Sequence, residues 1–322
     1  MTKKLISVIA PAYNEEGCVD ELVRRLTEVF DSNDNYDFEA IVVENGSIDS
    51  TFDLLKQASI VDDRFKVLRL SRNFGMDGGI TAGLEHISGD AAVIMTADLQ
   101  DPPELITAFL KKWEEGYENI YMTVTERTGT GLVRRLNTRL FYWLADRMTD
   151  HRIPRDASDF RLVDRKVYES VREMRERNRF VRGLFAWVGF RSIGIEHVRP
   201  ARFAGRSKAH TRTVFRLAVK GVLAHSYLPL KLITLIGISC SAIAFVALII
   251  MSSFWVLVGV PFAGFGTIVA IGLLAFGLLA SMIGILAEYL GLVYEEVKHR
   301  PNFVVSEVIG IEAQEGRGVQ ER

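Results

Sequence analysis

Two absences divide this chain of 322 residues into parts that suit different environments. Residues 232–287 contain no Asp, Glu, Lys or Arg, and no acidic residue occurs between Glu196 and Glu288. A membrane-spanning helix needs about 20 mostly apolar residues, so the uncharged stretch is long enough for two spans. The Pro and Gly residues of 258–266 would let the chain turn between them. A soluble helical hairpin is disfavoured because soluble helices keep a polar face.

Cysteine is also scarce, and no leader is visible. Cys18 lies in the polar first part and Cys240 in the uncharged stretch, so we expect two thiols and no disulfide. The apolar run within MTKKLISVIAPAYNEE is too short for a secretory signal. We therefore expect the polar region before residue 232 to stay in the cytoplasm.

Basic residues favour the same topology. Lys and Arg are dense before the first expected span, Lys298 and Arg300 follow the second, and the loop between the spans has no charge. The positive-inside rule then places both termini in the cytoplasm. The basic segment before the membrane would attract anionic headgroups or a phosphate. Nucleic acid is not an expected partner, because the net charge of the whole chain is -1.

Short apolar runs alternate with helical patterns in the first part of the chain. LISVIAPAYN, FEAIVVENGSIDS, FKVLRLSRNFG and AAVIMTAD indicate strands, and CVDELVRRLTEVF, STFDLLKQAS and GGITAGLEHI between them indicate helices. This alternation predicts an α/β fold with a parallel sheet covered by helices. Further on, Arg212, Arg216 and Lys220 share one helical stripe, which is typical of a helix in the membrane interface or of an amphipathic core helix.

The segment AAVIMTADLQDPPELI changes abruptly from apolar to polar. Thr96, Asp98, Gln100 and Asp101 follow the buried run and precede two prolines. Open α/β sheets bind ligands at the carboxyl ends of their strands, so Asp98 is a candidate metal ligand. The structural alternative is that Asp98 caps the helix that begins at PPELI.

Six motifs together resemble a known family. VIAPAYNEE, VVENGSIDST, LSRNFG, TADLQDPPE, SDFRL and RNRFVRGLFAWVGF occur in this order before the uncharged stretch. The chain resembles the family-two glycosyltransferases that load a sugar onto a polyprenyl phosphate, the group of the bactoprenol glucosyltransferases and dolichol-phosphate mannose synthase. The resemblance covers roughly residues 5–303. It implies a GT-A fold, a Rossmann-like mixed sheet with flanking helices, followed by two transmembrane helices.

The resemblance also implies a domain order and a reaction. We expect a cytoplasmic GT-A domain at 1–210, an amphipathic interface region at 211–230, two spans within 231–296 and a cytoplasmic tail at 297–322. The implied activity is an inverting transfer from a UDP- or GDP-sugar to polyprenyl (undecaprenyl) phosphate, for cell-envelope glycosylation. The enzyme would be a multi-pass protein of the inner membrane with a cytoplasmic catalytic domain. Both a monomer and a homo-oligomer are compatible with the sequence.

On the donor side, the resemblance places Pro11, Tyr13, Glu15 and Asn45 in the nucleotide pocket. Asn45 departs from the family, which usually has Asp there, and an amide both donates and accepts hydrogen bonds. Three arginines lie on the loop that would close over the donor, where Arg forks suit diphosphate oxygens: Arg127, Arg134 and Arg135.

The resemblance assigns carboxylates to the metal site, and we expect basic residues to bind the acceptor phosphate. Asp98 and Gln100 match an Asp-x-Asp-x-Gln motif that binds Mg²⁺ or Mn²⁺, while Thr96 replaces the first Asp and predicts a weaker metal site. Asp159, the second catalytic carboxylate, matches the family residue beside the acceptor phosphate; alternatively it is a structural partner of Arg161. The lipid phosphate is expected at Arg202, Arg206 and Lys208. A solvated basic face is the alternative for both arginine groups.

Two other functions fit part of the sequence. Thr96 and Asn45 would also fit a catalytically weakened or inactive membrane partner, but the retention of Asp98, Gln100 and Asp159 favours the enzyme. A processive polysaccharide synthase is disfavoured because the Gln-x-x-Arg-Trp signature is absent.

The topology can be tested with a tag at the C-terminus of the full chain. We expect the tag to be labelled only from the cytoplasmic side, because two spans with basic flanks return the chain to that side. Labelling in intact cells and in inverted membrane vesicles measures this. A tag reached only from the outer face would contradict the prediction.

Overall fold

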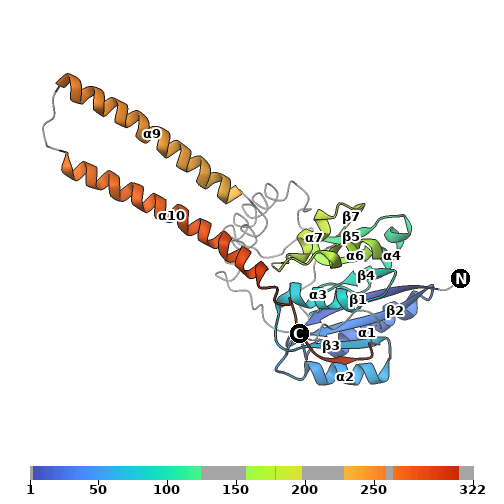
Figure 1. Ribbon diagram of the computed structural model, residues 1–322. Helices are drawn as coiled ribbons and strands as arrows, with labels where there is room; N and C mark the ends of the chain where they lie inside the picture. The colour runs from blue at the N-terminus through green and yellow to red at the C-terminus, as the bar shows by residue number, and fades with distance from the viewer. Residues whose placement is uncertain (1–2, 125–156, 178, 198–227, 259–263, 312–322) are drawn as a thin grey trace. The chain divides into compact units, whose positions relative to one another are not determined.

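The computed structural model describes residues 3–124, 157–177, 179–197, 228–258 and 264–311. The chain divides into two compact units, residues 1–210 with 300–322, and residues 211–299. The first unit is built on a β-sheet with helices, and the second contains two long helices (Figure 1).

The first half of the sheet has the predicted alternation. The parallel strands are β1 (Lys4–Ala12), β2 (Tyr36–Glu44), β3 (Phe65–Leu70) and β4 (Ala91–Ile94). They are connected by α1 (Val19–Ser32), α2 (Thr51–Val61) and α3 (Gly75–His86). Parallel neighbours need such crossover helices, so the strands and helices expected from the sequence are confirmed here.

The second half makes the sheet mixed. It contains α4 (Leu105–Glu114), β5 (Asn119–Val124), β6 (Ala157–Asp164), α6 (Arg165–Glu173), α7 (Val181–Trp187) and β7 (Ser192–His197). β6 runs antiparallel to β4 and to β5, while β5 and β7 are parallel. The described strands have the order β7-β5-β6-β4-β1-β2-β3-β8. A mixed sheet with flanking helices is what the resemblance implies.

The last strand of the sheet comes from beyond the long helices. β8 (Val305–Ile309) lies antiparallel beside β3 at the edge of the sheet (Figure 1). The Ser71 N–H also donates to the Val304 carbonyl over 2.9 Å. The segment expected as a cytoplasmic tail therefore adds a strand that covers the edge of β3, which would otherwise present unpaired backbone groups.

Side chains alternate between two hydrophobic layers. Ile6, Val8 and Ala10 of β1 face a cluster with residues of α1, α2 and α4, whereas Ile9 faces a second cluster with residues of α3, α6 and α7. This period of two is the geometry of a strand. Helices therefore cover both faces of the sheet.

The second unit consists of α9 (Leu228–Val258) and α10 (Phe265–Val297), at the positions where two spans are expected. The helices run in opposite directions (Figure 1), and Gly237 of α9 lies close to Met282 of α10. Within the described part of the chain, one stretch, Ala275–Val297, is long and apolar enough to cross a membrane. The expectation of two transmembrane helices therefore stays a prediction.

Two glycines let α3 approach β1 closely. A Cβ atom added at Gly79 would lie 2.9 Å from Pro11 Cβ, and one added at Gly83 would lie 2.3 Å from Ile9 Cγ2. Both distances are shorter than packed carbon atoms allow. The position of α3, and of the side chains on its first turn, therefore depends on these small residues.

We expect Gly83→Ala to lower the free energy of unfolding by about 1–3 kcal/mol, because the added methyl group overpacks the contact with Ile9. Thermal unfolding of the full chain in detergent measures the change. Gly291→Ala is the matched control, since no atom lies within 4 Å of the Cβ it would add. Equal unfolding temperatures for the Gly83 variant and the parent would contradict the prediction.

Candidate active site

Polar residues expected in the site meet at one edge of the sheet. β4, β1 and β2 are neighbours, and their carboxyl ends lead into the loops that carry Asp98, Glu15 and Asn45. β6 runs the other way, with Arg161 opposite Ile94. Asp159 is nearer the start of β6 and therefore belongs to the same edge.

The loops after β1 and β2 are hydrogen-bonded to each other. The Asn14 N–H donates to Ser47 Oγ over 3.0 Å, and Asn14 Oδ1 accepts from the Ile48 N–H over 2.9 Å. The Glu15 N–H donates to Thr51 Oγ1 over 2.9 Å. Asn14 has a φ of 52°, in the left-handed region that Asn tolerates better than most residues. The chain therefore holds the loop of Tyr13 and Glu15 in one conformation.

Asn45 connects the loop after β2 to the start of α3. Its buried amide accepts from the Phe74 N–H over 2.9 Å and donates to the Gly75 carbonyl over 2.8 Å. A carboxylate could not donate to that carbonyl. The departure from the family Asp thus has a structural reason, and the assignment of Asn45 to the nucleotide pocket stays a prediction.

Thr96 joins two carboxylates after β4. Thr96 Oγ1 lies 2.7 Å from Asp98 Oδ1 and 2.7 Å from Asp101 Oδ2, and the Thr96 N–H donates to Asp101 Oδ2 over 3.0 Å. The Gln100 N–H donates to Asp98 Oδ1 over 3.2 Å. Asp101 is fully buried, and Leu99 has a φ of 58°. Such backbone strain concentrates at functional sites.

The alternative role of Asp98 as a helix cap is not borne out. α4 begins only at Leu105, and its N-cap residue Glu104 makes no side-chain capping bond. Asp98 instead belongs to the tight turn that begins at Thr96.

Asp98 supplies a carboxylate, the kind of oxygen ligand that a hard divalent cation prefers. No group of three or more His, Cys, Asp or Glu side chains able to hold a metal occurs among the residues that the model describes. Mg²⁺ and Mn²⁺ often bind through one or two carboxylates and complete their shell with water and substrate phosphate. Asp98 fits such a site, and the hydroxyl of Thr96 adds no charge to it.

Asp159 is paired with an arginine of α7. Arg182 Nε donates to Asp159 Oδ1 over 2.9 Å, and Nη2 donates to Oδ2 over 2.6 Å. Arg161 is buried; it donates to the carbonyls of Ser158 and Asp159 and lies 5.0 Å from the ring centre of Phe185. Burial lowers the pKa of Arg161 to about 10. The alternative that Asp159 is a structural partner of Arg161 holds for the backbone, since Arg161 Nε donates to the Asp159 carbonyl over 3.3 Å, whereas the Asp159 carboxylate pairs with Arg182.

Asp77 links α3 to α7. Its carboxylate, on the first turn of α3, accepts from the Val181 N–H over 3.1 Å. Burial raises the pKa of Asp77 to about 6, and Asp159 adds to the rise, whereas Arg182 and Arg179 oppose it. Asp77 therefore keeps its proton to a higher pH than an ordinary Asp, and it belongs to the same charged cluster as Asp159.

The remaining residues expected in the site differ in burial, and some of them lie outside the described residues. Pro11 is buried in β1 against Gly79, whereas Tyr13, Glu15 and Gln100 are partly exposed. The two expected arginine clusters lie outside the described residues: Arg127, Arg134, Arg135, Arg202, Arg206 and Lys208.

Arg182, Asp77 and Asp101 were not assigned roles from the sequence. Arg182 stands within RNRFVRGLFAWVGF and Asp101 within TADLQDPPE, so the motifs pointed to the right segments. No sequence pattern marked Asp77, because its partner Val181 is 104 residues away.

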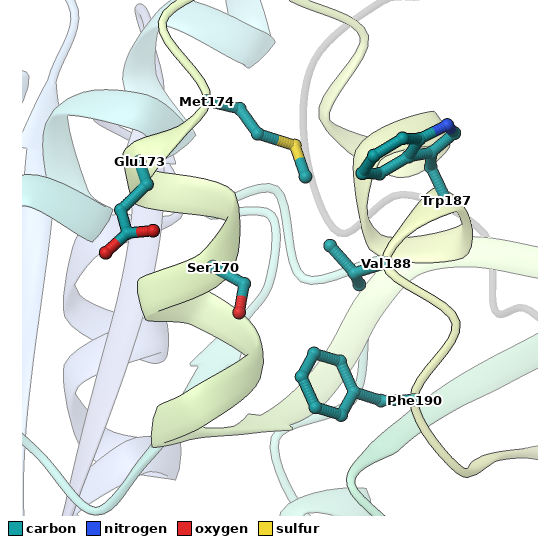
Figure 2. Close-up of a pocket in the computed structure, with 6 residues that line it drawn as sticks. All are labelled: Ser170, Glu173, Met174, Trp187, Val188 and Phe190. Atoms are coloured by element: carbon teal, nitrogen blue, oxygen red, sulfur yellow. The ribbon is translucent and has the colours of Figure 1, made fainter.

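A hollow of about 370 Å³ lies between α6 and α7, lined by Ser170, Glu173, Met174, Trp187, Val188 and Phe190. In Figure 2 Met174, Trp187 and Val188 approach one another across this hollow, and Phe190 lies beside Val188. None of the expected site residues lines it. Its lining includes the acidic Glu173 and no basic side chain, so it does not match a site for diphosphate or phosphate groups.

The pKa of Asp77 predicts a pH dependence of stability. Because the folded pKa, about 6, exceeds the usual 3.8, the folded state binds this proton more tightly than the unfolded state. The resulting stabilisation is complete below pH 3.8 and is lost as the pH rises through about 6. A shift of this size corresponds to about 3 kcal/mol.

Asp77→Asn keeps an oxygen for the Val181 N–H but has no charge. We expect the variant to match the parent in stability near pH 4 and to exceed it at pH 8. Chemical unfolding across this pH range measures the free energy of unfolding of both proteins. Groups that titrate in the same way in both proteins cancel in the difference. A difference that does not change with pH would contradict the assignment.

Comparisons with known proteins agree with the geometry. The model of glycosyl transferase family 2 matches residues 7–172. The uncharacterized glycosyltransferase YkcC of Bacillus subtilis is 39% identical over 307 residues, which cover 95% of this chain and 94% of that protein. The bactoprenol glucosyl transferase of Shigella phage SfV is 32% identical over 300 residues, which cover 93% and 97%.

A solved structure shares the fold. Glucosyl-3-phosphoglycerate synthase from Mycobacterium tuberculosis, crystallised with Mn²⁺, uridine diphosphate and phosphoglyceric acid, superposes with a TM-score of 0.51 at 17% identity. The match covers 68% of this chain and 76% of that chain. The mixed sheet, the family match and the near full-length relatives lead to one conclusion: the chain belongs to glycosyltransferase family 2 and is a glycosyltransferase with the GT-A fold.

Proposed function

We propose that this glycosyltransferase transfers a sugar from a nucleotide diphosphate sugar, UDP- or GDP-linked, to polyprenyl phosphate at the cytoplasmic face of the inner membrane. The observation that carries the proposal is the near full-length similarity to proteins named bactoprenol glucosyl transferase, which extends beyond the sheet and includes the segment of the long helices. Family membership supports the nucleotide-sugar donor.

The second unit supports a lipid acceptor. Large apolar side chains of α9 and α10 are exposed, among them Ile243, Phe245, Ile268, Phe276 and Leu290. An exposed apolar surface of this extent suits a membrane. The proposed arrangement is a catalytic domain over 1–210, an interface region at 211–230, two spans within 231–296 and the segment 297–322, which supplies β8, in the cytoplasm.

The proposed reaction is a single displacement with inversion at the anomeric carbon. The bond from this carbon to the diphosphate breaks as the bond to an oxygen of the lipid phosphate forms, and the nucleoside diphosphate leaves with the electron pair. Asp98 would hold Mg²⁺ or Mn²⁺, which neutralises charge on the diphosphate. Asp159 would stand beside the acceptor, at the same edge of the sheet as Asp98.

The function is tested by incubating the purified full chain in detergent with Mn²⁺ or Mg²⁺, undecaprenyl phosphate and a panel of nucleotide sugars. We expect one nucleotide sugar to yield a glycolipid, detected by mass spectrometry. If none does, the chain acts on another acceptor or is the inactive membrane partner considered above.

In this assay we expect Asp98→Asn to lower the transfer rate by about 10²-fold or more, because it removes the anionic ligand of the metal. The fold should persist, since the amide oxygen of Asn can still accept from Thr96 and Gln100 as Asp98 Oδ1 does. Asp53→Asn, at an exposed position of α2, is the matched control and should leave the rate unchanged. A folded Asp98 variant with the parent's rate would refute the assignment.

A further inference from the structure

The carboxylate proposed to stand beside the acceptor does not lie alone. Asp159 and Arg182 form a two-point contact through Nε and Nη2, with distances of 2.9 and 2.6 Å. Their side chains are 31% and 27% exposed, so the pair is partly open to solvent. A planar guanidinium joined to a carboxylate at two points fixes the carboxylate's orientation as well as its position.

Arg182 is itself held from two sides. The N–H of its neighbour Val181 donates to Asp77 on α3 over 3.1 Å. Just before α7, Arg179 Nη2 donates to the Val171 carbonyl of α6 over 2.6 Å. The start of α7 is therefore tied both to α3 and to α6.

The charges around the pair explain why an arginine is needed. A phosphate that approached an ionised Asp159 would be repelled, because like charges at short range disfavour each other. Arg182 contacts Asp159 and neutralises it. The other charged or titratable groups in this cluster come from several elements: Asp77, Arg161, Arg179, Glu85, Glu176 and Tyr121.

We propose that Arg182 is a positioning residue for the transfer reaction: it orients and neutralises Asp159 beside the anionic acceptor, and Asp77 keeps Arg182 in place through the start of α7. This inference rests on the proposed function, in which the acceptor carries a phosphate. It assigns Arg182 to the acceptor side of the site. Among the described residues, the two-point contact joins β6 to α7.

The test uses steady-state kinetics of the full chain in detergent, with undecaprenyl phosphate and the nucleotide sugar identified in the panel assay varied in turn. We expect Arg182→Gln to lower kcat/KM for undecaprenyl phosphate by on the order of 10²-fold, because the acceptor is misplaced. The KM of the nucleotide sugar should stay near that of the parent. Arg182→Lys should recover part of the loss, because it restores the charge without the two-point contact.

Arg175→Gln is the matched control, since Arg175 is exposed between α6 and α7. We expect it to behave as the parent in both kinetic series. Asp77→Ala, which removes the partner of the Val181 N–H, should reproduce the acceptor-selective loss to a smaller extent. Thermal unfolding of each variant shows whether it is folded at the assay temperature. If Arg182→Gln is unfolded at that temperature, the kinetic constants of Arg182→Lys decide whether the inference holds.

Equal changes in the kinetic constants of both substrates, or none in a folded Arg182 variant, would overturn the inference. These outcomes differ from a failure of the proposed function. If the parent forms no glycolipid with any nucleotide sugar, the proposed function fails and the inference falls with it. If the parent is active and undecaprenyl phosphate is used equally well by the folded Arg182 variants, the inference alone fails.

Discussion

The buried amide of Asn45 is the contact on which the geometry of the site depends. It accepts from the Phe74 N–H and donates to the Gly75 carbonyl, so it sets the position from which α3 starts. The loop after β2 is hydrogen-bonded at the same time to the loop after β1, through Asn14. Because an amide carries both a donor and an acceptor, one side chain satisfies two backbone groups that a carboxylate could not satisfy together.

From α3 the same constraint reaches Asp159 of β6. Gly79 and Gly83 allow this helix to lie directly against β1, and its first turn then offers Asp77 to the Val181 N–H. Arg182, the next residue, pairs with Asp159. The loop after β2 and the carboxylate of β6 are thus connected through one helix and a few hydrogen bonds. A change that shifts α3 should therefore disturb both the loop after β2 and the carboxylate of Asp159.

Local patterns predicted the fold well and the contacts poorly. Each apolar run of β1 to β4 is followed directly in the sequence by polar residues. Asp98 and Asn45 could therefore be placed at strand ends. β8 could not be foreseen, because a short edge strand pairs with β3 more than 230 residues away. The partner of the Asp159 carboxylate also depends on tertiary structure. Arg161 is nearer in sequence, but its guanidinium is buried against backbone carbonyls and Phe185. Arg182 contacts the carboxylate instead.

Thr96 replaces the first carboxylate of the family motif, while Asp98 and the nearby Asp101 keep theirs. Its hydroxyl lies 2.7 Å from oxygens of both Asp98 and Asp101, and it has one proton to share between them. A carboxylate at position 96 would place a third negative charge against two others, and a bound cation or a proton would be needed to relieve the repulsion. With a neutral hydroxyl there, repulsion within the turn is smaller before a cation arrives, and the electrostatic gain on binding it is smaller as well. If Asp98 holds a divalent metal, as the proposed function requires, Thr96 would lower the metal affinity and at the same time stabilise the metal-free turn.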